Sequence, residues 1–498
     1  MTAVTFPNGN GYSDAGETAN DMRNGGFRTN MLPMIGDTIA VANNAVTAAA
    51  AAVPAATTAT TAATTATQQA AIAVAAANTA VGTSLIKQPS EIAGIDPVLD
   101  FVFSASTAVP SGVITGSSSK WVTGPNGLLT SVAAGTCPID YDPTTGVTRG
   151  LLVEESRTNL LTNSVSLSGW STSSATRTLN AATGIDGAQS ASRFVATATS
   201  NTSPNVTLNT TSGTTYVMSL YCKLEVGSTW MRVRLADGST TVLNAWFNIS
   251  TRAVGTVNAA TGTITSFSAA QPINVGNGWV RIGVTFSTTA STLAFACAAA
   301  TGDGVGAMAI GDQWLMGWAQ HEAGSFPTSY IPTVGSTVTR AADVNTLLLS
   351  SVPGWNASEG MIYVEAELSY GVTPISQTLL SLDDGTANNI ITLFSELNSG
   401  KLLFRTANGG VTSTDILLST LAAAPTSTFK AAIAWSSGVA RASFNGSSLS
   451  VTGTVVPAVT KLSIFNRGDG LRPATGRIRR LTLFPRALSS STLPLLTA

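Results

Sequence analysis

The sequence predicts a mainly β protein in which two jelly-roll or β-sandwich domains follow an N-terminal α-helical coiled-coil stalk. At 498 residues the chain is too long for one core and should hold two or three domains. Charged residues make up only 10% of it, and short apolar stretches alternate with Gly, Asn, Ser and Thr, as is typical of β-sandwich proteins. Residues 32–88 depart from this pattern because their apolar residues recur in sevens.

Charge and cysteine usage exclude several classes of function. The 25 basic and 26 acidic side chains nearly cancel, so the sequence lacks the basic surface that nucleic acids or anionic membranes require. Cys137, Cys222 and Cys297 are scattered and match neither a metal motif nor a disulfide framework. Cys222 alternates with Met218 and Leu220, so we expect it to be a buried free thiol.

Residues 1–31 are rich in Gly and Asn and carry a few dispersed charges. We expect this segment to dock onto another component of an assembly and to become ordered there. The N-terminus shows no basic stretch followed by an apolar core, so the sequence predicts no secretory signal.

Residues 32–88 carry the heptad of a coiled coil, with Val, Ile or Thr at most a positions and mainly Ala at d. No residue between Asp37 and Lys87 is charged, so small-residue packing rather than ion pairs would hold the helices of a homotrimer together. Pro54 removes one backbone donor and predicts a kink. The predicted trimer seam comprises Leu32, Ile35, Ile39, Ala42, Val46, Ala49, Val53, Ala56, Ala63, Ala70, Val74, Ala77 and Val81.

Two other interpretations of the stalk remain open. A flexible low-complexity linker is the main one, because Thr-rich runs form helices poorly. A membrane span fits less well, since Thr, Asn or Gln interrupts every apolar run before it reaches ~20 residues.

Residues 95–345 change to a period of two, which predicts the first sandwich. The segments 216–225, 230–236 and 279–286 each place apolar side chains on one face and polar ones on the other. We expect these three segments to be strands of one half-buried antiparallel sheet.

Residues 346–498 repeat the alternation and predict a second sandwich, with turns at Asp384-Gly385, Asn408-Gly409 and Asn445-Gly446. The tail near residue 490 predicts a short capping helix. The outward basic residues of this sandwich suggest a solvated face rather than a site. They are Lys401, Arg405, Arg441 and the arginines of the RIRR string at 477–480.

Residues for catalysis are scarce, and the sequence predicts no catalytic residue, no metal site and no cofactor. His321 is the single histidine, and a lone His beside an acid is more often structural. Glu154 and Glu155 are adjacent, so on a strand they point to opposite faces and cannot both address one glycosidic bond. Asp140 and Asp142 would share a face, which leaves a calcium or sugar contact open beside a simple turn.

Sugar binding needs an aromatic face and side chains that reach hydroxyl groups. The non-core face of the first sandwich offers both on three predicted strands. The candidate glycan-binding residues are Tyr221, Lys223, Trp230, Arg232, Arg234, Trp279 and Arg281. For Trp279 and Arg281 the alternative is a stack that supports the sheet, and for the Trp230 strand it is a trimer interface or plain packing.

Two pairs of strings carry resemblances to known families. Residues 149–163 (RGLLVEESRTNLLTN) and 317–343 (GWAQHEAGSFPTSYIPTVGSTVTRAAD) resemble the carbohydrate-binding-module-like jelly roll of phage tail fibre and minor tail proteins. The strings FKAAIAWSSGVARASFNG and GRIRRLTLFPRALS resemble concanavalin A-like lectin domains of the laminin-G sort.

The resemblance implies a phage tail fibre, assembled in the host cytoplasm, with an N-terminal anchor, a trimeric shaft and C-terminal sandwiches that attach to a host surface glycan. The scarcity of acids on one face predicts that it is not an enzyme. Its expected partners are two further copies of the chain, other phage tail or baseplate proteins at the N-terminus, and a host surface polysaccharide or lipopolysaccharide. A tailspike-like depolymerase and a purely structural collar, shaft or head fibre are the alternatives.

Overall fold

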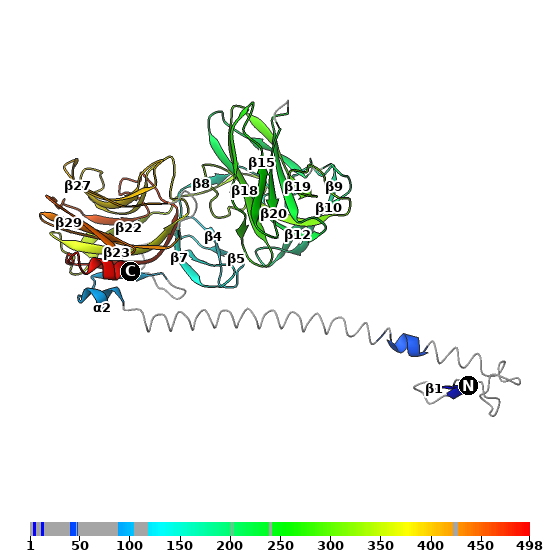
Figure 1. Ribbon diagram of the computed structural model, residues 1–498, viewed down its shortest axis with the longest axis horizontal. Helices are drawn as coiled ribbons and strands as arrows, with labels where there is room; N and C mark the ends of the chain where they lie inside the picture. Colours follow the sequence, from blue (N-terminus) through cyan, green and yellow to red (C-terminus); the bar gives the residue numbers. More distant parts are fainter. Residues whose placement is uncertain are drawn as a thin grey trace. The chain divides into compact units, whose positions relative to one another are not determined.

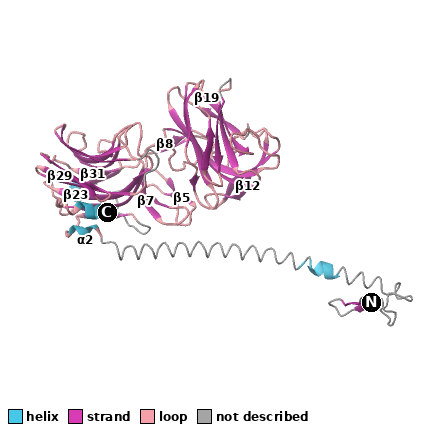
Figure 2. Ribbon diagram, in the orientation of Figure 1, coloured by secondary structure: helices cyan, strands magenta, loops and turns pink. Residues whose placement is uncertain are grey.

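A computed structural model of the chain describes residues 3–5, 11–13, 40–45, 47, 88–103, 118–200, 202, 204–238, 242–421 and 427–498. The chain forms two compact units, Met1–Val74 and Ala75–Ala498 (Figure 1). Strands dominate the second unit, and its two described helices are short (Figure 2).

The described residues of the first unit form an antiparallel strand pair and a short helical stretch. Strand β1 (Ala3–Thr5) pairs with β2 (Gly11–Ser13), and residues 40–45 and 47 are helical. Of the predicted seam, Ala42 lies on this stretch and is exposed, whereas the other twelve positions lie outside the described residues. The coiled coil and the trimer therefore stay predictions.

The first sandwich consists of two antiparallel sheets (Figure 1). The larger sheet has the order β16-β18-β12-β20-β10-β9, with β17 beside β18, and the smaller sheet has the order β11-β19-β13-β14-β15. The strands are β9 (Ala175–Thr183), β10 (Gln189–Ala196), β11 (Asn205–Asn209), β12 (Thr215–Val226), β13 (Trp230–Ala236), β14 (Val242–Asn248), β15 (Ala253–Val257), β16 (Ile264–Ala269), β17 (Ile273–Asn274), β18 (Val280–Thr288), β19 (Thr292–Ala300) and β20 (Gln313–Ala323).

The predicted alternation of inward and outward residues is confirmed on β12, β13 and β18. Met218, Met231 and Val284, for example, all lie in the core between the two sheets. The expectation that these strands share one sheet is wrong, because β13 lies in the smaller sheet. The chain crosses between the sheets after β12 at Gly227, where φ is 92° and a Cβ atom would lie 1.8 Å from Oδ1 of Asp312.

The second sandwich has a six-stranded sheet, β22-β31-β24-β25-β26-β27, and an eight-stranded sheet, β30-β29-β28-β23-β32-β7-β6 with β3 beside β32. The strands from its own part of the chain are β22 (Asn345–Leu348), β23 (Gly360–Leu368), β24 (Gln377–Asp383), β25 (Ile390–Ser395), β26 (Lys401–Asn408), β27 (Val411–Thr420), β28 (Phe429–Ser436), β29 (Val439–Phe444), β30 (Ser447–Thr452), β31 (Lys461–Ile464) and β32 (Gly476–Phe484), and the 3₁₀ turn η1 is Leu349–Ser351. In the hairpin of β29 and β30, Asn445 and Gly446 have φ of 43° and 84°, which confirms a turn of the type predicted there.

Three strands of the eight-stranded sheet come from far upstream. They are β3 (Leu99–Val102), β6 (Ile139–Tyr141) and β7 (Thr148–Val153). The period of two predicts that these residues belong to the first sandwich, but β3 and β7 both pair with β32. Their side chains, among them Phe101 and Leu151, lie in the core of the second sandwich. The strands of the second sandwich therefore come from two parts of the chain, one before and one after the first sandwich.

Two helices and a hairpin cover outer faces of the sheets. Helices α2 (Pro89–Ala93) and α3 (Leu493–Thr497) contribute to an apolar cluster on the eight-stranded sheet, and α3 confirms the predicted capping helix. The hairpin of β4 (Lys120–Thr123) and β5 (Leu129–Val132) packs against a cluster on the seven-stranded sheet of the first sandwich.

Candidate functional site

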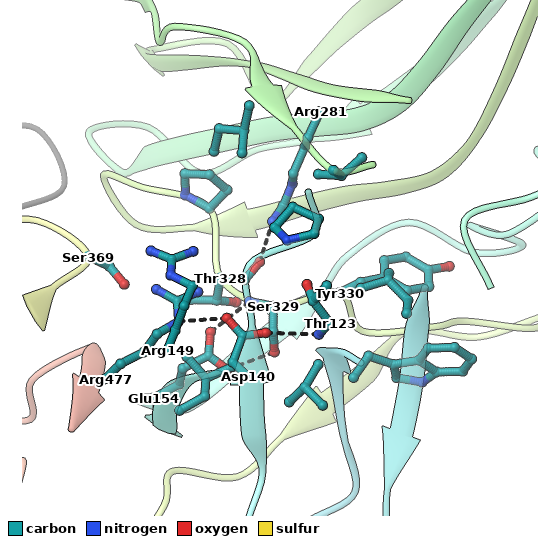
Figure 3. Close-up of a pocket in the computed structure, with 18 of the residues that line it drawn as sticks. Thr123, Asp140, Arg149, Glu154, Arg281, Thr328, Ser329, Tyr330, Ser369 and Arg477 are labelled. Carbon is teal, nitrogen blue, oxygen red and sulfur yellow. Dashed lines mark hydrogen bonds and ion pairs between the residues drawn. The ribbon is translucent and has the colours of Figure 1, made fainter. Parts of the chain in front are cut away.

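A pocket of about 250 Å³ lies where the β4–β7 segment, the first sandwich and the second sandwich meet (Figure 3). We call it the joint pocket. Strand β12 contributes Tyr221, β18 contributes Arg281, β7 contributes Arg149 and β32 contributes Arg477. Its lining also includes Trp121, Thr123, Asp140, Glu154, Asn274, Thr328, Ser329, Tyr330, Ser369 and Tyr370.

The two strings 149–163 and 317–343 meet beside this pocket. Within them, β8 (Arg157–Asn159) pairs with β21 (Val338–Arg340). The Asn159 side chain, which is buried, donates to the carbonyls of Ala319 and Ile331 at 3.0 and 2.8 Å. The two strings therefore lie together at the joint of the two sandwiches.

Glu154 is the central charge of that joint. Its carboxylate lies 3.0 Å from Arg340 and 3.5 Å from Lys120, and it accepts hydrogen bonds from the amide and hydroxyl of Ser329, both at 2.7 Å. Burial alone would raise the pKa of Glu154, but Arg340, Lys120 and the Ser329 donors lower it to about 2. Glu154 is therefore a fixed anion at neutral pH.

Arg149 of β7 and Arg477 of β32 line another side of the joint pocket. Arg477 bonds Asp140 and Glu367, both at 2.6 Å, and Arg149 pairs with the same Glu367. The second oxygen of Asp140 accepts from the amide of Thr123 at 2.8 Å (Figure 3). Arg149 keeps 30% of its side chain exposed, so this guanidinium can reach a molecule in the pocket.

Arg281 and the tyrosines enclose the pocket from the first sandwich. The Arg281 guanidinium lies 5.2 Å from the ring centre of Tyr221 and donates to the Thr328 carbonyl and the Ser219 hydroxyl at 2.8 and 2.9 Å. The Tyr330 ring lies edge-on to Tyr221 at 6.5 Å. Stacking of this kind fixes the rings and orients the cation.

The structure separates the predicted glycan-binding residues into two groups. Tyr221 and Arg281 line the pocket, Trp279 is buried edge-on against Trp318 at 5.3 Å, and Lys223 donates to the carbonyl of Asn277 at 2.9 Å. The stack of Trp279 and Arg281 that the sequence suggests as an alternative is not present, because Arg281 lies over Tyr221 and Trp279 lies against Trp318. Contact of either residue with a glycan stays a prediction.

The second group lies on the other sheet of the first sandwich, on β13. Trp230 is half-buried beside Gly255, Arg232 is only 7% exposed, and Arg234 is half-buried. Desolvation, followed by the charge of Arg234, lowers the pKa of Arg232 to about 10. One glycan unit therefore cannot touch both groups, and contact of Trp230 or Arg234 with a glycan stays a prediction.

Several residues of the pocket were missed or read differently in the sequence. The RIRR string predicts a solvated face, but the Arg477 side chain is only 16% exposed because it bridges two acids. The missed signal is the pairing of Arg477 with Glu367 across β32 and β23, two strands with alternating charges. Asp142 proves to be a turn former, since its side chain accepts from the amides of Thr144 and Thr145.

Other chemistry is sparse in the described part of the chain. Within it, no three His, Cys, Asp or Glu side chains lie together as metal ligands would, and no helix is long and apolar enough to cross a membrane. The three cysteines are free, and Cys222 is buried as predicted.

No protein-family model and no curated protein matches this chain. Among solved structures, a carbohydrate-binding module (CBM40) of the Ruminococcus gnavus IT-sialidase, bound to α2,6-sialyllactose, is similar over 31% of this chain and 93% of its own, at 16% identity and a TM-score of 0.27. The mouse laminin α1 chain domains LG4-5 are similar over 59% of this chain and 92% of theirs, at 10% identity and a TM-score of 0.19. Similarity is low in both cases.

Proposed function

We propose that this chain is a non-enzymatic attachment protein of a virion fibre and that its joint pocket binds one unit of a host surface glycan. The observation that carries the glycan part is the combination of aromatic rings, arginines and hydroxyl-bearing side chains around one cavity. Rings offer a face to the apolar side of a sugar, and the polar groups around them fix its hydroxyls.

The size of the pocket limits the ligand. About 250 Å³ lies just below the ~300–1,000 Å³ of ordinary small-molecule sites, so one sugar ring fits better than a longer segment. Trp121 and Tyr370 are partly exposed, and so is Arg149, whereas Tyr221 and Arg281 are buried behind them. The first three are the side chains that a sugar would meet on entry.

The carboxylates of the pocket favour binding over hydrolysis. A glycosidase needs one carboxylic acid that carries a proton at working pH. Glu154 has a pKa of about 2 and is held by two cations, and both oxygens of Asp140 are occupied by Arg477 and Thr123. Neither group is placed as a general acid.

Substitution of Arg149 tests the site. Arg149→Gln should weaken binding of the glycan selected by the full chain on a glycan array at least tenfold, because one charge-assisted hydrogen bond is worth ~1.5–3 kcal/mol. Titration calorimetry measures the affinity, and a thermal melt of each variant checks folding. Arg193→Gln, which removes the same charge from an exposed pair with Glu225, should bind as the parent does.

Three results would refute the proposal: no glycan retained by the folded chain, equal binding by the Arg149 and Arg193 variants, or release of reducing sugar from host polysaccharide. The last result would favour the depolymerase alternative.

The fibre part of the proposal rests on the resemblance and on the heptad of residues 32–88. We expect the full chain to have three times the 50.6 kDa protomer mass in solution at micromolar concentration. Val46→Asp would place a charge in the seam and should shift the mass toward that of a monomer. Asn44→Asp adds the same charge at an outer heptad position and should leave a trimer. A monomeric parent chain would contradict the stalk.

A further inference from the structure

A second pocket, of about 150 Å³, lies on the outer face of the six-stranded sheet of the second sandwich. Strand β25 supplies its floor, because Ile390, Thr392 and Phe394 face outward while Ile391 and Leu393 enter the core. This pocket shares no residue with the joint pocket.

Three arginines surround this floor. Arg405 on β26 lies 4.9 Å from the ring centre of Phe394, and Arg472 lies 6.0 Å from the same centre. Arg467, from the loop after β31, completes the lining. Phe394 is only 3% exposed, so the arginines and not the ring form the accessible surface.

The local acids do not balance these cations. Arg405 pairs with Asp415 at 2.7 Å and Arg467 with Asp469 at 2.6 Å. Within the part of the chain that the structure describes, the Arg472 side chain has neither a hydrogen bond nor an ion pair. Burial, and then the charges of Arg467 and Arg405, lower the pKa of Arg472, and the attraction of Asp469 offsets only part of this decrease.

Hydrogen bonds to the six-stranded sheet fix the backbone of the loop that carries Arg467 and Arg472. Asp383, which is fully buried, accepts from the Gly468 amide at 3.0 Å, and Lys461 donates to the Gly468 carbonyl at 2.6 Å. A Cβ at residue 468 would lie 1.8 Å from Asp383, so only glycine fits there. At the other end, the Arg472 carbonyl accepts from the Thr378 amide at 3.0 Å. The arginines are thus preorganised before any ligand arrives.

We propose that this pocket binds a single oxyanion group, such as the phosphate, sulfate or carboxylate of an acidic saccharide. Planar guanidinium groups match the oxygens of such an anion in pairs. A neutral sugar is a poor fit, because the one aromatic ring of the lining is covered. The anion would relieve the repulsion among the arginines, and the volume suits one small charged group.

Calorimetric titration of the full chain at constant ionic strength tests this site, with inorganic phosphate, glucose 6-phosphate and glucose as probes. We expect saturable binding of the two phosphates, and no glucose binding that depends on Arg472. Arg472→Asn should weaken phosphate binding at least tenfold. Asn is chosen because Arg472 has a φ of 59°, which Asn tolerates. Arg441→Asn removes an arginine of the same sandwich outside the pocket and should bind as the parent does.

Asp415→Asn supplies an independent variant that adds rather than removes binding. It frees the Arg405 guanidinium from its carboxylate and should tighten phosphate binding several-fold. Absence of saturable phosphate binding by the folded parent would overturn the proposal, as would equal losses in the Arg472 and Arg441 variants, which would indicate net charge alone. The joint pocket is untouched by these variants, so glycan binding there can fail or succeed separately.

Discussion

Replacing Glu154 by Gln should lower the free energy of unfolding by about 3–5 kcal/mol, the range measured when one partner of a buried ion pair is removed. Glu154 is 3% exposed and faces two cations, Arg340 and Lys120, that are also buried. A neutral amide of the same shape leaves Arg340 without the carboxylate that it pairs with, whereas Lys120 keeps its ion pair with Asp343. It also replaces one acceptor oxygen by an NH₂ group that points at the Ser329 donors.

Chemical denaturation at pH 7 measures the loss. Glu225→Gln is the matched control, because its pair with Arg193 is 23–34% exposed and should contribute at most about 1 kcal/mol. Since Glu154 lies at the joint, its variant should also separate the unfolding transitions of the two sandwiches. Similar small losses in both variants would show that the joint does not depend on this carboxylate.

The fold class and the faces of the strands follow from the sequence because they depend on local alternation. Apolar and polar residues alternate around both Met218 and Met231, and both side chains are buried as expected. Which sheet a strand joins is not a local property. The three-residue connection from β12 to β13 would suit a hairpin, yet it crosses the sandwich because Gly227 fits against Asp312.

The site is harder to predict for the same reason. Asp140 and Arg477 are 337 residues apart, and they meet only because β6 and β7 join the sheet that contains β32. Sequence patterns identified Tyr221 and Arg281 as a ring and a cation on one face, which is correct. They could not indicate that the β4–β5 hairpin covers that face and leaves only the pocket edge open.

The chain should lose about 3 kcal/mol of stability between pH 6.5 and pH 4 through His321 alone. This histidine is 1% exposed, stacks 6.0 Å from Phe286, and donates from Nε2 to the Asn209 carbonyl at 3.1 Å. Burial lowers its pKa from the usual 6.5 to about 4. The unfolded chain therefore takes up a proton at a higher pH than the folded chain, so stability falls as pH drops through this interval.

The free energy of unfolding changes by 1.36 kcal/mol per pH unit over the interval between the two pKa values of His321. Solvent does not screen this contribution, because the imidazole is buried. His321→Gln keeps a donor for the Asn209 carbonyl but cannot take up the proton. The buried carboxylates titrate alike in both proteins, so the difference between the two curves of unfolding free energy against pH isolates His321. We expect that difference to change by about 3 kcal/mol in favour of the variant as pH falls from 6.5 to 4. A constant difference across that range would mean that water or a local opening solvates the imidazolium in the folded chain.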